Sequence, residues 1–220
     1  IIMLKKQINI IGIHDGHNAS VALLKNGKIV YALSEERLSR IKNSGGIPYK
    51  AIIRLLKDNK LSPKSINCVA VSGIQPPRPE WIERNKLLKR YRDQFYDQPT
   101  LFNRIYRKLN EIINFKKTIK TNIKELSLNR LQKLKSLGFI SEQIKFLDHH
   151  KCHASAGFYS SKRRDEKVLI LTNDGGGDGL CASVNISENG KIKRLAEVKQ
   201  KHSFATLFSR TTFLMGMVPL

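Results

Sequence analysis

The sequence predicts an α/β protein of two lobes, each built on a mixed β-sheet, with the second lobe incomplete. Apolar segments of strand length alternate with helical patterns, and a strand–turn–strand unit near the N-terminus recurs around residue 174. Apolar residues make up 40 % of the 220 residues, which is enough for a packed core and excludes wholesale disorder.

The first lobe is expected over residues 1–160 and opens with three strands. Residues 8–13, 20–24 and 28–33 are apolar runs of strand length. An Asn-Gly pair at 26–27 separates the last two runs, and it is a strong hairpin signal because both residue types accept positive φ.

A helix and a fourth strand follow in the same lobe. Residues 49–59 place apolar side chains at helical spacing directly after Pro48, and residues 66–71 are again an apolar run. Residues 80–137 then carry a helical pattern with Lys and Arg on the opposite face, which predicts a basic helical insertion.

The second lobe is expected to begin within residues 165–220. A strand at 168–172 runs into a glycine-rich loop at 174–179, and a second strand covers 180–186. Another Asn-Gly pair, at 189–190, predicts a hairpin and a return strand. Before this lobe, residues 149–160 have a helical pattern that we group with the first lobe.

The two strand–turn–strand units suggest a duplicated architecture. Asp15-Gly16 and Asp174-Gly175 occupy the same place in the two units, so two lobes can face each other across a cleft with these carboxylates at its floor. This layout is that of the actin-like ATPase superfamily, whose lobes are ribonuclease-H-like. The backbone N–H groups of Gly175, Gly176 and Gly177 could form an anion-binding nest there.

A histidine cluster is the sharpest local signal. His149 and His153 are four residues apart, which places both imidazoles on one helix face. Such a pair suits a divalent metal, and Asp174 is the natural third ligand. His150 points elsewhere and could contact a phosphate or support a ligand. The alternative is that these histidines are helix caps or surface groups.

Two further groups are candidates for chemistry. His17 follows Asp15 in the first turn and can act as a general acid or base, unless it is simply an exposed turn residue. Arg37, at the end of the third strand, carries a charge suited to phosphate or carboxylate, although an exposed charged cluster fits the same spacing.

Charge, cysteine content and hydropathy limit the classes of function that the sequence allows. The net charge is +22, and residues 82–135 hold 15 Lys and Arg against 5 Asp and Glu. This segment lacks the aromatic–glycine pattern of readers of single-stranded RNA, so nucleic acid is disfavoured as a partner. Three cysteines without CxxC spacing favour a reducing, cytoplasmic location. No apolar run is long enough for a membrane span.

Four sequence blocks together resemble one enzyme family, the NodU/CmcH-type O-carbamoyltransferases. Their order and spacing match the family's D-x-H-x-A-S, E-E-R-(F/L)-(S/T)-R, H-H-x-x-H-A and D-G-x-G motifs. In this chain the blocks are Asp15–Ser20, Ser34–Arg40, His149–Ala154 and Asp174–Gly177.

The resemblance implies transfer of a carbamoyl group from carbamoyl phosphate, through ATP and a carbamoyl-adenylate, to a hydroxyl of a small molecule. It implies an actin-like N-terminal domain that holds a metal, usually iron. The ligands would be His149, His153 and Asp174, and Gly175–Gly177 would cradle the nucleotide phosphates.

The first block would form the reaction centre. By the same resemblance, Asp15 and His17 belong there, with His17 taking the proton of the acceptor hydroxyl. The part of the family that completes the second lobe and carries a YrdC-like domain is missing, so we expect it as a possible separate chain. Leu38 replaces the usual phenylalanine of the second block.

Two other functions stay open at this point. An ATP-dependent kinase of the same superfamily would use Asp15 as a base and has no use for His149 and His153. A basic nucleic-acid-binding or scaffold protein would use residues 82–135 and carry a vestigial site.

Overall fold

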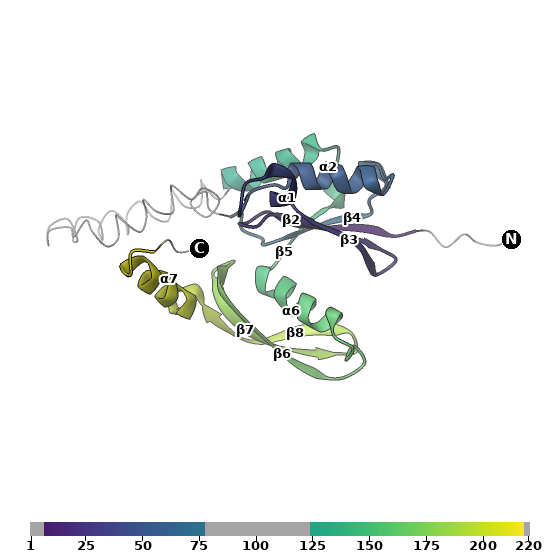
Figure 1. Cartoon of the computed structure of the whole chain (residues 1–220). Helices are drawn as coiled ribbons and strands as arrows, with labels where there is room; N and C mark the ends of the chain where they lie inside the picture. Colours follow the sequence, from purple (N-terminus) through teal and green to yellow (C-terminus); the bar gives the residue numbers. More distant parts are fainter. Residues whose placement is uncertain (1–6, 78–123, 218–220) are drawn as a thin grey trace. The chain divides into compact units, whose positions relative to one another are not determined.

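The computed structural model describes residues 7–77 and 124–217, and the chain divides into two compact units (Figure 1). The first unit comprises Ile1–Val71 and Pro76–Lys145. The second comprises Ser72–Gln75 and Phe146–Leu220. In the described parts, no helix combines the length and apolar character needed to cross a membrane.

A five-stranded mixed sheet organises the first unit. Its strand order is β3-β2-β1-β4-β5, with β1 antiparallel to β2 and parallel to β4. An antiparallel meander extended by a parallel strand is the ribonuclease-H-like arrangement, so the predicted α/β actin-like fold class is confirmed. The strands are β1 (Asn9–His14), β2 (Ser20–Lys25), β3 (Lys28–Ser34), β4 (Cys68–Ser72) and β5 (Ile144–Leu147).

The predicted helix after Pro48 is confirmed as α2 (Tyr49–Asp58). Its buried face carries Ile52 and Leu55, both fully buried, and burying each such side chain contributes about 1.5–3 kcal/mol. The buried Glu35 carboxylate, just before α1 (Glu36–Ser39), accepts hydrogen bonds from backbone N–H groups in the first turn of α2. Glu35, two residues before the candidate Arg37, therefore caps the first turn of α2.

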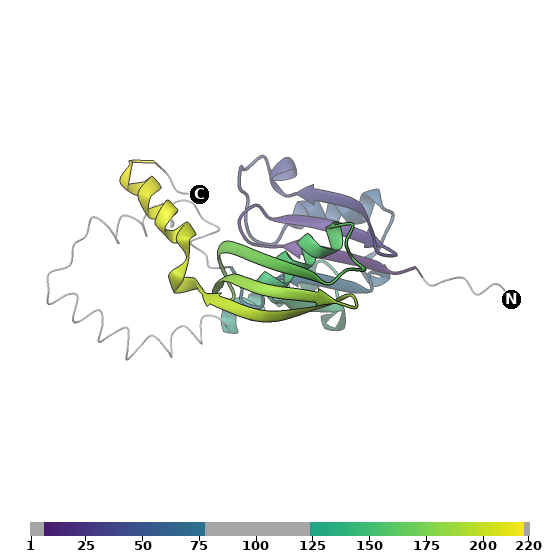
Figure 2. The same ribbon diagram turned by 90° about the horizontal axis from the view of Figure 1, so that it is seen from below.

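The second unit is a three-stranded antiparallel sheet with helix α6 packed on it. The strands lie in the order β6-β7-β8, and Figure 2 shows them side by side. Helix α6, which the sequence analysis grouped with the first lobe, packs on this sheet, with Ala154 and Phe158 against Ile170. The elements are α6 (His149–Ser160), β6 (Val168–Gly177), β7 (Leu180–Glu188), β8 (Lys191–Lys199) and α7 (Phe204–Leu214).

The predicted glycine-rich loop at 174–179 is wrong in its extent. Strand β6 continues through Gly177, and only Asp178 and Gly179 form the turn, with φ of 51° and 83°. Gly177 pairs with Leu180 across this turn. An Asp-Gly pair with two positive φ angles is the signature of a type I′ hairpin, which the sequence analysis overlooked. The pairing register shifts between Asn173 and Gly177.

The predicted basic insertion lies mostly outside the described residues, which resume at residue 124. Residues 124–136 are helical, and two side chains from this helix, Arg130 and Leu134, are buried. This end of the segment therefore belongs to the packed first unit. Three short 3₁₀ turns complete the described elements: η1 (Pro63–Ser65), η2 (Ser141–Gln143) and η3 (Gln200–His202).

Candidate metal centre

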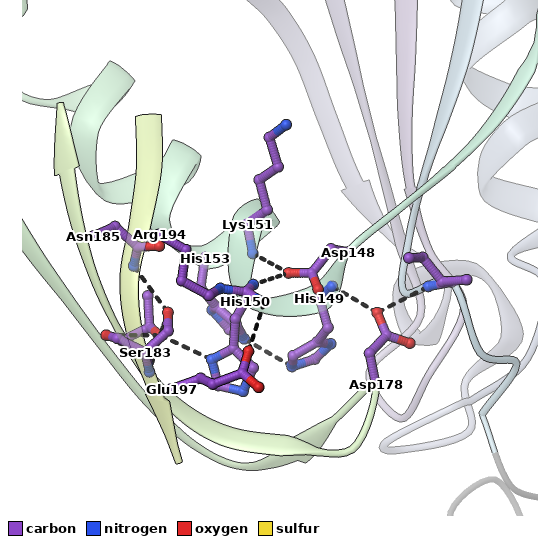
Figure 3. Close-up of polar contacts among 12 residues, drawn as sticks. Asp148, His149, His150, Lys151, His153, Asp178, Ser183, Asn185, Arg194 and Glu197 are labelled. Carbon is purple, nitrogen blue, oxygen red and sulfur yellow. Dashed lines mark hydrogen bonds and ion pairs between the residues drawn. The ribbon is translucent and has the colours of Figure 1, made fainter. Parts of the chain in front are cut away.

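Helix α6 begins at the histidine cluster. Asp148 is its N-cap, and the side chain accepts a hydrogen bond of 2.7 Å from the Lys151 backbone N–H (Figure 3). The Arg194 guanidinium from β8 also donates to this carboxylate. His149 is thus the first residue of a well-capped helix, and His153 follows one turn later on the same face.

The two imidazoles and one carboxylate of β6 converge. His149 Nε2 lies 2.6 Å from Asp174 Oδ2, and His153 Nε2 lies 3.4 Å from the same oxygen. The two ring nitrogens are 3.0 Å apart. One ligand atom from each residue lies within 4.8 Å of the others, so the structure brings together the three ligands predicted from the sequence.

These separations fit the edges of a coordination sphere. Metal–ligand bonds of about 2.1 Å place neighbouring donors about 3.0 Å apart at right angles and about 3.4 Å apart at tetrahedral angles. Two of the separations, 3.0 and 3.4 Å, match these values, and the third, 2.6 Å, is the shorter hydrogen bond between His149 and Asp174. Two imidazoles with a carboxylate are also a donor set that divalent first-row metals accept.

Hydrogen bonding in the cluster favours an ionised carboxylate. Hydrogen bonds from His149 and then His153 outweigh burial and hold the pKa of Asp174 far below its ordinary range. The bond to Asp174 raises the pKa of His153, against the opposing effect of burial. A ligating carboxylate must be deprotonated, so Asp174 is ready to bind a cation.

Gly175, Gly176 and Gly177, predicted to cradle phosphates, line this part of β6. A Cβ built on Gly177 would overlap the His149 ring, and a Cβ built on Gly176 would overlap the Gln200 side chain. Protein side chains therefore occupy the space beside two of the three glycines. The Gly175 N–H donates to Asp174 Oδ1 at 2.6 Å.

His150 lies on the buried side of α6. Its imidazole is fully buried, and Nδ1 lies 2.8 Å from Thr172 Oγ1. Thr172 Oγ1 lies 2.7 Å from Ser183 Oγ. Asn185 donates to the same Ser183 oxygen at 2.8 Å (Figure 3). Burial lowers the pKa of His150, which the backbone of Leu180 partly opposes. Its contact with a phosphate stays a prediction.

This buried polar chain was missed at the sequence level. The strand alternation of β7 places Ser183, Asn185 and Ser187 on one face, and all three are buried. Three polar residues at every second position were the available signal. They indicated a polar strip beneath a helix.

In the first unit, Asp15 and His17 have different surroundings. The Asp15 carboxylate is buried and accepts two hydrogen bonds from Arg130, at 2.5 Å from Nε and 2.7 Å from Nη2. The His17 imidazole is exposed, with Nδ1 3.2 Å from the side-chain amide of Asn18. Arg37 is exposed and lies 3.7 Å from Glu36.

The fold and this donor cluster define a two-unit α/β protein with a candidate metal centre. Residues 9–219 match the family described as Carbamoyltransferase N-terminus, and the chain belongs to this family. It is 30 % identical over 212 residues to the uncharacterized protein MJ1051 of Methanocaldococcus jannaschii, covering 96 % of this chain and 31 % of that protein. It is 25 % identical over 200 residues to the nodulation protein NolNO of Sinorhizobium fredii, covering 91 % and 25 %.

Solved structures with a similar chain course include YeaZ from Pseudomonas aeruginosa, with a TM-score of 0.40 and 10 % identity over 87 % of this chain and 68 % of that one. The PPX-GPPA enzyme of Aquifex aeolicus has a TM-score of 0.40 and 11 % identity over 93 % and 56 %. The chain spans less than a third of the length of the two curated relatives named above.

Proposed function

We propose that this chain takes part in carbamoyl transfer to a small-molecule hydroxyl and supplies the metal centre for that reaction. The observation that supports this most is the convergence of His149, His153 and Asp174 in a chain of the carbamoyltransferase family. A kinase of the same superfamily would have no use for two imidazoles at this place.

The residues of the second unit would hold a divalent metal, with iron as the expected ion. Bound there, the metal would polarise the carbamoyl oxygen and stabilise the negative charge that develops on it. Asp174 contributes the anionic ligand, and the two histidines contribute neutral nitrogens. The carbamoyl donor in this proposal is a carbamoyl-adenylate made from carbamoyl phosphate and ATP.

The first unit would handle the proton. His17 is exposed, and a ring nitrogen of imidazole can accept a proton from a hydroxyl group. In the proposed step the acceptor oxygen bonds to the carbamoyl carbon, His17 takes the hydroxyl proton, and AMP leaves with the electron pair of the broken C–O bond. Asp15 is better suited to anchoring the turn that carries His17, because Arg130 occupies both of its oxygens.

The nucleotide and partner assignments rest on the family. Of the three glycines, Gly175 has the most open surroundings, since a Cβ built there meets only Ala205, at 3.7 Å. Its N–H donates to Asp174, so a phosphate would have to share or replace this hydrogen bond. A YrdC-like domain, in the same or a separate chain, would make the adenylate.

The proposal is tested by metal loading and ligand binding. The 220-residue chain should bind one Fe²⁺ under anaerobic conditions, and a non-hydrolysable carbamoyl-adenylate analogue should bind more tightly once the metal is present. His153→Ala should abolish both effects. The matched control is His202→Ala, which alters an exposed histidine outside the cluster. Failure of the wild-type chain to bind Fe²⁺ stoichiometrically would refute the proposed function.

A further inference from the structure

His149 is held at three points by one short segment of β6 and its turn. Its ring nitrogen Nε2 contacts Asp174, and its ring lies against Gly177. Its backbone N–H donates to Asp178 at 2.8 Å (Figure 3). The first contact belongs to the candidate metal centre. The other two involve residues to which neither the motifs nor the proposed function gives this task.

The Asp178 carboxylate joins two segments of the second unit. Oδ2 accepts from the N–H groups of His149 and Ile74, the latter at 2.9 Å, and Oδ1 accepts from Gln75 at 2.7 Å. Hydrogen bonds to an ionised acceptor are about twice as strong as neutral ones. Since Asp178 itself lies in the tight type I′ turn, these bonds fix the first residue of α6 to a rigid hairpin.

Gly177 determines where the ring of His149 can lie. A Cβ at this position would overlap ring atoms Cγ, Cδ2 and Nδ1. The ring can pack this closely only because residue 177 has no side chain. The Cγ end of the ring, with Cδ2 nearer than Nδ1, lies against residue 177. At the opposite end of the ring, Nε2 contacts Asp174 and His153.

We propose that Gly177 and Asp178 are positioning residues that seat the imidazole of His149 and aim its Nε2 at the metal centre. This inference deepens the proposed function and rests on it for the identity of the centre. It gives the end of the glycine-rich segment a specific task, which is to hold a histidine in place.

The test begins with Asp178→Asn, which places an amide NH₂ against backbone N–H donors. Asp165→Asn is the matched control, because it removes the same charge from an exposed turn. With histidine-labelled chain, Asp178→Asn should shift the His149 imidazole resonances in the metal-free protein. It should also weaken Co²⁺ affinity about 10–100-fold, which is the usual effect of losing a residue that is hydrogen-bonded to a metal ligand. Asp165→Asn should change neither.

Gly177→Ala is the second variant and leaves every charge in place. It should displace the same His149 resonances and weaken Co²⁺ binding, while circular dichroism shows a folded chain. This variant decides the question if Asp178→Asn does not fold. Unchanged His149 resonances in either folded variant would overturn the inference. A wild-type chain that binds no Co²⁺ would refute the proposed function, and the imidazole resonances of the metal-free protein would still decide this inference.

Discussion

The two Asp-Gly units of this chain have the same local sequence pattern and contain carboxylates in opposite situations. Asp15 is buried, and a guanidinium pairs with both of its oxygens. Asp174 is only partly buried and faces two imidazoles. The partner that the rest of the chain supplies therefore decides what the aspartate of an Asp-Gly pair can do. A guanidinium only donates hydrogen bonds and occupies both oxygens of Asp15, whereas imidazole nitrogens can share a metal ion with the carboxylate of Asp174.

The same substitution at the two positions should separate these roles most strongly. Asp15→Asn leaves the buried Arg130 without its counter-charge, and breaking such a pair costs about 3–5 kcal/mol of unfolding free energy. Asp174→Asn should change the stability of the metal-free chain far less, because this side chain is partly solvated. Urea unfolding of both variants in the presence of a chelator measures the difference.

The other side of the buried pair offers a control within one helix. Arg130→Met should destabilise the chain by a similar amount, whereas Lys133→Met, which alters an exposed residue of the same helix, should have little effect. Equal stabilities of these two variants would contradict the structural role given to Asp15.

For metal affinity, in contrast to stability, the substitution at Asp174 should have a larger effect than the substitution at Asp15. Asp174→Asn removes a proposed ligand. It should reduce Co²⁺ affinity by more than the loss of about 10–100-fold that follows removal of a residue hydrogen-bonded to a metal ligand. Asp15→Asn, if folded at low temperature, should retain the affinity of the second unit. A competition titration with a coloured chelator measures both values, and an Asp174→Asn variant that binds as well as wild type would remove this residue from the site.

The smallest effect concerns an exposed ion pair in the first unit. The pKa of Asp58 is lowered mainly by a hydrogen bond from Arg54 and, to a smaller extent, by a hydrogen bond from Tyr31. A lowered carboxyl pKa contributes stability above the ordinary value, and this contribution is lost as pH falls through the folded-state value. Arg54→Met should therefore lower the melting temperature only slightly at pH 7, with the difference disappearing in acid. A drop as large as that of Arg130→Met would show that burial does not distinguish the two pairs.

Local patterns in the sequence were enough to predict most of the fold. Alternating apolar runs located the strands, and the Asn-Gly pairs at 26–27 and 189–190 marked hairpins, where all four residues have positive φ. Helical spacing and the repeated unit also led to His149, His153 and Asp174, which lie within 25 residues of one another.

Contacts between distant residues could not be predicted in this way. Arg130 pairs with Asp15 across 115 positions, and it lies in a segment whose basic residues looked like a solvated face. Asp178 reaches Ile74 across 104 positions. No local periodicity encodes such a pair, because the tertiary fold determines which distant segments meet.

The central claim is that two imidazoles and one carboxylate of the second unit bind a single metal ion. X-ray absorption at the metal edge, recorded on the chain loaded with one Fe²⁺, tests it most directly. We predict two imidazole nitrogens and at least one carboxylate oxygen at about 2.0–2.2 Å, with the imidazole signal lost in a His149→Ala, His153→Ala double variant. A spectrum without imidazole scattering, or one unchanged in the double variant, would contradict the account.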